Sequence, residues 1–184
     1  MNPVKPELKF TYQDYVLLPE DKRYELVDGD LCMVPAPRPY HQNVCGEIEL
    51  ALRQFVKERK LGQVLDAPCD VYFSQYDVVQ PDILFILSER LGIIKETYIQ
   101  GAPDLVVEVL SPSDPGRDRE VKRKLYSRYG VQEYWIVDPD ARSIEVLTRQ
   151  EGTLSTLQTF VASDSLTSPL LEGFQLHLPP VFKF

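Results

Sequence analysis

The stretch Leu105-Val106-Val107-Glu108-Val109-Leu110 is an apolar run that a single acid interrupts. Near-continuous apolar runs of this length are typical of strands that are covered on both faces of a sheet. Glu108 has apolar neighbours on both sides, so no alternation of inward and outward residues explains it. Because an unpaired carboxylate in such a strand is costly, we expect a cationic partner for Glu108 or a cleft at this point. The alternative is a strand that curls outward at a sheet edge.

A second acid stands at the start of another apolar run. Asp82 follows Pro81 and precedes Ile83-Leu84-Phe85-Ile86-Leu87. Alone, Asp82 is a typical strand-start residue that caps a turn. Together, carboxylates at Asp82 and Glu108 on adjacent buried strands indicate a divalent-cation site of the kind used for phosphodiester hydrolysis. With two histidines and no cysteine pair at zinc spacing, the composition favours Mg²⁺, Mn²⁺ or Ca²⁺ over zinc.

The pattern around these strands predicts one α/β domain at residues 11–184, preceded by a proline-spaced arm at residues 1–10. A short helix is expected after Thr11, and a hairpin turns at Asp28-Gly29-Asp30. Longer helices are expected at residues 41–60 and 117–129. The predicted strands are 64–73, 78–87, 105–110, 133–138, 143–149 and 154–161. This order predicts a mixed sheet with helices packed against it.

The predicted helix at 117–129 is rich in basic residues, although the net charge of the chain is −8. A helical wheel at about 100° per residue gives an apolar arc that contains Val121, Leu125 and Tyr129. Lys122 lies inside this sheet-facing arc, so its ammonium is directed toward Glu108, whereas Lys124 lies outside it. Most of the other basic residues are expected on a solvated face, where Arg123 and Lys124 are candidate contacts for nucleic-acid phosphates.

Several motifs together resemble one known family. They are residues 23–29, His41-Gln42, Pro81-Asp82, residues 101–113, Lys122 with Tyr126, and residues 130–139. Over roughly residues 11–182 the chain resembles the Uma-type family of restriction-endonuclease-like proteins, within the PD-(D/E)XK nuclease superfamily. The resemblance implies a restriction-endonuclease-like core with a mixed sheet flanked by helices. It also implies that Asp82 and Glu108 are the two acids of the motif and hold Mg²⁺ or Mn²⁺.

The sequence departs from the superfamily pattern at one position. The family motifs also contain two further candidate residues, Glu25 and His41. The superfamily usually places its lysine two residues after the second acid, where this chain has Leu110. The resemblance suggests a lysine displaced onto the following helix, where the wheel places Lys122. Glu25 is a candidate for the metal shell or for a strand ion pair. His41 is a candidate ligand, phosphate contact or structural residue at the start of the long helix.

These residues predict a metal-dependent endonuclease, in which Asp82 and Glu108 bind the ion and Lys122 orients the water or neutralises the scissile phosphate. DNA is the expected substrate, RNA is not excluded, and hydrolysis of another phosphoester is a third reading. The alternative from another class is a catalytically idle or weak nuclease-fold protein that acts as a nucleic-acid-binding or assembly module. The net charge of −8 and the pI of 4.8 favour it, because an acidic domain attracts DNA weakly.

The remaining expectations concern location and assembly. No apolar run approaches the ~20 residues of a membrane helix, and the first residues lack the apolar segment of a secretory signal. The three cysteines are expected to be reduced thiols, so a cytoplasmic location is predicted. A twofold homodimer is the default expectation, because nucleases that cut two strands often pair subunits.

Overall fold

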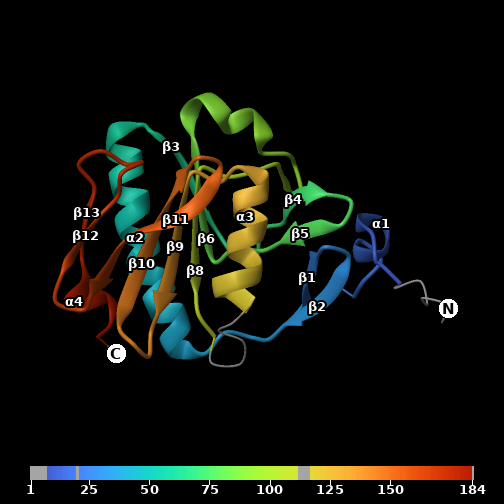
Figure 1. Ribbon diagram of the computed structural model, residues 1–184, viewed down its shortest axis with the longest axis horizontal. Helices are drawn as coiled ribbons and strands as arrows, with labels where there is room; N and C mark the ends of the chain where they lie inside the picture. Colours follow the sequence, from blue (N-terminus) through green and yellow to red (C-terminus); the bar gives the residue numbers. More distant parts are fainter. Residues whose placement is uncertain (1–7, 20, 112–116, 184) are drawn as a thin grey trace.

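The computed structural model describes residues 8–19, 21–111 and 117–183. Residues 1–7 of the predicted arm, and Pro112 and Ser113 of the 101–113 motif, lie outside the described residues. The fold is α+β, with two sheets and a small separate hairpin (Figure 1). No helix in the described part of the chain is both long and apolar enough to cross a membrane.

The larger sheet has six strands in the order β11-β10-β9-β8-β6-β3. Its strands are β3 (Gly62–Asp66), β6 (Ile83–Leu87), β8 (Leu105–Val109), β9 (Glu133–Asp138), β10 (Ser143–Gln150) and β11 (Thr153–Val161). β8 pairs parallel to β9 and antiparallel to β6, so the sheet is mixed, as predicted. The strand that carries Glu108 is therefore central, and the sheet-edge alternative is wrong.

The smaller sheet has five strands in the order β2-β1-β5-β4-β7. Its strands are β1 (Arg23–Val27), β2 (Asp30–Val34), β4 (Val71–Ser74), β5 (Asp77–Val79) and β7 (Ile99–Gln100). The remaining short elements are α1 (Tyr12–Tyr15), the 3₁₀ helix η1 (Ser88–Ile93), the hairpin β12 (Ser165–Thr167) with β13 (Gln175–His177), and α4 (Leu178–Val181). β1 and β2 form the predicted hairpin.

Two predicted strands are wrong, because each is divided between the two sheets. The predicted strand 64–73 is β3 of the larger sheet followed by β4 of the smaller one. The predicted strand 78–87 is β5 of the smaller sheet followed by β6 of the larger one. A proline, Pro68 or Pro81, stands at each division, and proline cannot donate a hydrogen bond to a strand ladder. The two crossings place the start of β6 at the junction of the sheets.

Helices cover opposite faces of the larger sheet (Figure 1). On one face lies α2 (Pro39–Arg59), which buries four apolar residues at helical spacing: Val44, Ile48, Leu52 and Val56. On the other face lies α3 (Arg123–Tyr129), together with the smaller sheet. Along β8, Val107 packs with the α2 cluster and Val106 with the α3 cluster. Because side chains alternate along a strand, Glu108 faces α3.

The predicted helix at 117–129 is helical throughout, but its first part, η2 (Arg117–Lys122), is a π-helix. The wheel correctly places Lys122 inside and Lys124 outside, since Lys122 is 5% exposed and Lys124 is exposed. It is wrong for Val121, which is 41% exposed. A π-helix has i→i+5 hydrogen bonds, so the angle of about 100° that holds for an α-helix does not apply before Arg123. Gly130, at φ +93°, ends α3 as expected.

Candidate functional site

One cavity of about 360 Å³ collects five of the residues predicted from the sequence. They are Glu25 of β1, His41 of α2, Asp82 before β6, Glu108 of β8 and Lys122 of η2. These residues come from five separate segments of the chain, and both sheets contribute. The cavity is therefore the candidate functional site.

Lys122 joins the two glutamates of the cavity through its ammonium. Its Nζ lies 2.8 Å from Glu108 Oε1 and 3.1 Å from Glu25 Oε1. The Tyr126 hydroxyl donates a second hydrogen bond to Glu108 Oε1 at 2.6 Å. All four residues are buried. The cationic partner expected for Glu108 is thus confirmed.

The environment keeps the Tyr126 hydroxyl protonated. Burial, followed by the negative charge of Glu108, raises the pKa of Tyr126 well above its ordinary value. A neutral hydroxyl donates a hydrogen bond to an ionised carboxylate, and such charge-assisted bonds are stronger than neutral ones. Tyr126 therefore helps to hold Glu108 in place from α3.

Glu25 is held from the strand beside it. Besides the ammonium of Lys122, Glu25 Oε1 accepts the backbone N–H of Gln80 at 3.0 Å. Glu25 thus forms a buried ion pair and also lines the cavity, so the two roles considered from the sequence are compatible.

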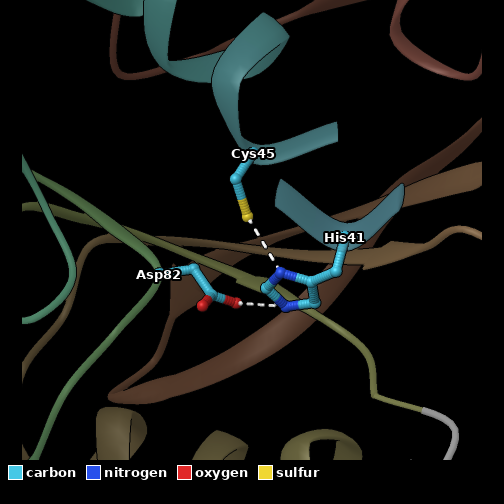
Figure 2. Close-up of side chains that lie close together, drawn as sticks. All are labelled: His41, Cys45 and Asp82. Atoms are coloured by element: carbon cyan, nitrogen blue, oxygen red, sulfur yellow. Dashed lines mark hydrogen bonds and ion pairs between the residues drawn. The ribbon is translucent and has the colours of Figure 1, made fainter. Parts of the chain in front are cut away.

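Asp82 and His41 form a second contact group, at the end of β8 (Figure 2). Asp82 Oδ2 accepts the backbone N–H of Val109 at 2.8 Å and lies 3.3 Å from His41 Nε2. The same Nε2 lies 3.0 Å from the carbonyl oxygen of Val109. Since both groups that face Nε2 are acceptors, Nε2 carries a proton in this arrangement. The backbone of Val109, next to Glu108, is a site component that the apolar sequence did not indicate.

The pKa values of Asp82 and His41 move in opposite directions. Burial opposes the charged form of His41, but the hydrogen bond and charge of Asp82 outweigh it, so the pKa of His41 is raised. Burial likewise opposes ionisation of Asp82, but His41, the Val109 N–H and Lys122 outweigh it and lower the pKa of Asp82. Asp82 is therefore an ionised carboxylate at neutral pH.

Cys45 is a neighbour of the site that sequence reasoning missed. Its Sγ lies 3.5 Å from His41 Nδ1, so the imidazole lies between the thiol and the Asp82 carboxylate (Figure 2). The signal was the i, i+4 spacing of His41 and Cys45 on one helix face. Burial, and then the charges of Asp82 and Glu108, raise the pKa of Cys45, which keeps the thiol neutral. Cys45 is a free thiol.

The donors at the cavity fit a hard or borderline divalent cation. Asp82 and Glu108 offer carboxylates, Val109 offers a carbonyl oxygen, and His41 Nε2 offers a nitrogen once its proton is lost. Oxygen ligands suit Mg²⁺ and Mn²⁺, and one imidazole is compatible with Mn²⁺. Among the described residues, Asp82 Oδ1 has no hydrogen-bond donor, so it remains available to a cation. Within the same residues, one group of three metal-capable side chains is compact, namely His41, Cys45 and Asp82.

Arg123 and Lys124 lie away from this cavity, in a separate basic hollow. The hollow also contains Arg119, Arg128 and Arg149, and none of its lining residues lines the cavity. Arg123 donates two hydrogen bonds to the carbonyl oxygen of Leu154, at 3.0 and 2.9 Å. Much of the positive charge of the hollow is thus engaged in contacts within the protein.

Comparison with known proteins agrees with the motifs of the sequence. A family model, Uma2, with the description "Putative restriction endonuclease", matches residues 12–179. No curated protein matches the chain. A solved structure, that of "a putative nuclease belonging to DUF820 from Anabaena variabilis ATCC 29413", is similar with a TM-score of 0.79 and 21% sequence identity. The similarity covers 94% of this chain and 97% of that chain, and it confirms the predicted fold.

Proposed function

Because the chain belongs to the Uma2 family of putative restriction endonucleases, we propose that it hydrolyses phosphodiester bonds in nucleic acid, with DNA as the first substrate to test. The observation that carries this proposal is the cavity in which Glu25, His41, Asp82, Glu108 and Lys122 meet. Three of these five residues are carboxylates, and one ammonium lies between two of them. Such a site suits a divalent cation and a negatively charged substrate.

In this proposal Asp82 and Glu108 hold Mg²⁺ or Mn²⁺, and His41 and the Val109 carbonyl are available as further ligands. When held by these residues, such an ion would supply polarisation of a phosphoryl oxygen and would lower the pKa of a water molecule. The protein supplies the geometry. The Val109 N–H fixes Asp82, and the Tyr126 hydroxyl fixes Glu108.

Lys122 is the proposed source of positive charge beside the reacting phosphate. Its ammonium is held at two carboxylates, so little reorganisation is needed when negative charge develops on a phosphoryl oxygen. The same ammonium can donate a hydrogen bond to the attacking water and orient it.

A second candidate function is a catalytically idle nuclease-fold protein that serves as a nucleic-acid-binding or assembly module. The observation that favours its assembly role is the net charge of −8, which weakens attraction to nucleic acid. Arg123 and Lys124, the phosphate contacts predicted from the sequence, lie in the separate basic hollow, so their role in binding stays a prediction. The homodimer and the cytoplasmic location remain predictions.

The test is cleavage of supercoiled plasmid DNA in millimolar Mn²⁺. Wild type should nick or linearise the plasmid, and Glu108→Gln should be slower by about 10²-fold or more, as expected for the loss of a positioned catalytic group. Glu89→Gln, an exposed glutamate on η1, is the matched control and should retain activity. Cleavage that is equally fast in Glu108→Gln, or that persists in EDTA, would refute the proposed site.

Metal binding is tested separately from cleavage. A cation that binds only the folded state raises the melting temperature. Mn²⁺ should therefore stabilise wild type, and the effect should shrink in Asp82→Ala. An equal rise in both proteins would place the ion elsewhere. Stabilisation by Mn²⁺ without plasmid cleavage would favour the second candidate.

A further inference from the structure

Arg23 lines the cavity but has no role in the proposed reaction. It stands two residues before Glu25 on β1, so the alternation of side chains puts both on one face of the strand. Arg23 lines the same cavity as Glu25 and Asp82. Its Nε donates a hydrogen bond to Gln80 Oε1 at 2.9 Å, and the backbone N–H of Gln80 binds Glu25. The guanidinium is therefore positioned by the same network that positions the acid.

Within the described part of the chain, the guanidinium of Arg23 has no ion-pair partner. Four carboxylates line its cavity, namely Glu25, Asp82, Glu108 and Asp140, yet among residues 8–19, 21–111 and 119–183 no carboxylate forms an ion pair with this guanidinium. The one hydrogen bond it makes with these residues uses Nε, which leaves both terminal nitrogens as donors. The two terminal nitrogens of a guanidinium that is held at Nε can donate two parallel hydrogen bonds to a phosphate group, whose geometry they match.

Arg38 is a second arginine at the same cavity. It is the residue before the first turn of α2, it is exposed, and it lines the cavity together with Arg23 and His41. In the regions that the structure describes, Arg38 has no ion pair and no side-chain hydrogen bond. The positive end of the α2 dipole lies at the same place and adds to the field of the two arginines.

In the basic hollow beside α3, by contrast, most basic side chains have partners within the protein. Arg123 is bound to the Leu154 carbonyl, Arg119 is paired with Asp138 and Glu145, and Arg128 is paired with Asp28. Among its basic side chains, Lys124 is the exposed one for which the described residues offer no partner.

We infer that Arg23 and Arg38 bind the phosphate backbone of the substrate strand next to the scissile phosphate, so that the strand crosses the mouth of this cavity rather than the basic hollow. The inference rests on the proposed function, because it takes the bond to be cut to lie at Asp82 and Glu108. It identifies the recognised group as a nucleic-acid phosphodiester. A contact to phosphate alone gives affinity without dependence on base sequence.

The inference is tested by binding without cleavage, in Ca²⁺, with a fluorescein-labelled DNA duplex that carries single-stranded ends. Affinity is measured by fluorescence anisotropy over a range of salt concentrations. Arg23→Gln should weaken binding about 10-fold and reduce the slope of log affinity against log salt by about 1, as expected when one phosphate contact is lost. Arg38→Gln should also reduce the slope, and the double variant should reduce it by about 2. Lys124→Gln, which removes the same charge from the hollow, should change both quantities less.

Folding and metal binding are controlled in the same proteins. Arg23→Gln should keep the circular dichroism spectrum and the Mn²⁺-induced rise in melting temperature of wild type. If Arg23→Gln does not fold, the affinity and salt slope of Arg38→Gln, which changes an exposed residue, test the inference alone. Unchanged affinity in the arginine variants, or a larger loss in Lys124→Gln, would overturn the inference and leave the proposed function standing. Failure of wild type to bind this DNA would overturn both.

Discussion

Lys122→Met is the substitution that tests the organisation of the site most directly. Methionine keeps the unbranched apolar part of the side chain but leaves Glu25 and Glu108 without the ammonium that both contact. At an effective dielectric constant of about 20, the lost attractions are about 6 kcal/mol for Glu108 at 2.8 Å and about 5 kcal/mol for Glu25 at 3.1 Å. Most of this gross energy offsets the desolvation of three charges.

The net cost follows from what the variant leaves behind. Removing one partner of a buried ion pair costs about 3–5 kcal/mol, since a charge then stays buried without its counterion. We expect this loss in the free energy of unfolding of Lys122→Met, measured by urea denaturation at pH 7. For a domain of this size the melting temperature should fall by roughly 10 °C. Lys124→Met, on the exposed side of α3, is the matched control and should change stability by less than about 0.5 kcal/mol.

Two further measurements on Lys122→Met separate its stabilising role from its proposed catalytic role. Mn²⁺ should raise the melting temperature of this variant at least as much as that of wild type, because Asp82 and Glu108 remain and the competing ammonium is gone. Plasmid cleavage should still fall by about 10²-fold or more at a temperature where the variant is folded. A stability loss below about 1 kcal/mol, equal to that of Lys124→Met, would refute the reasoning from the buried cluster. Equal and mild losses of cleavage in both variants would refute the role of a displaced lysine.

Three other outcomes follow from the contacts described above. Tyr126→Phe should cost about 1.5–3 kcal/mol in urea unfolding, because it removes a buried hydrogen bond to a charged group and little else; a loss below about 0.5 kcal/mol would contradict this. Glu133→Gln should cost about 1–3 kcal/mol, since both of its carboxylate oxygens accept N–H groups, from Trp135 and Leu170, and an amide would face one of them with a donor; unchanged stability would show that these bonds are replaceable. The stabilising effect of the His41–Asp82 pair should be largest near pH 5, because it is lost as pH rises through the raised pKa of His41 and as pH falls through the lowered pKa of Asp82. The difference in unfolding free energy between wild type and His41→Gln at pH 3, 5 and 8 checks this, and a difference that grows toward pH 8 would contradict it.

Much of the site could be predicted from the sequence, because the patterns that indicated it each lie within one short segment of the chain. The lone acid in the apolar run of β8 indicated a buried charge with a partner, and the cation was found at Lys122. The wheel predicted the buried side of Lys122 correctly although this residue ends the π-helix η2, because its φ of −65° and ψ of −37° are those of an α-helix. The hairpin and the two main helices followed from turn residues and from the 3.6-residue period.

Tertiary structure decided what local patterns do not encode. Periodicity shows which face of a strand is apolar but not which sheet the strand joins, so the divisions at Pro68 and Pro81 were missed. It also places Arg23 on the same face as Glu25 without showing that α2 brings Arg38 to the same cavity. The Val109 backbone entered the site because α2 crosses the end of β8. Helical spacing places Cys45 beside His41, but only the packing of α2 brings this pair to Asp82. The contacts of His41 with Val109 and Asp82 join residues far apart in sequence, and their geometry depends on how whole elements pack, which no local pattern determines.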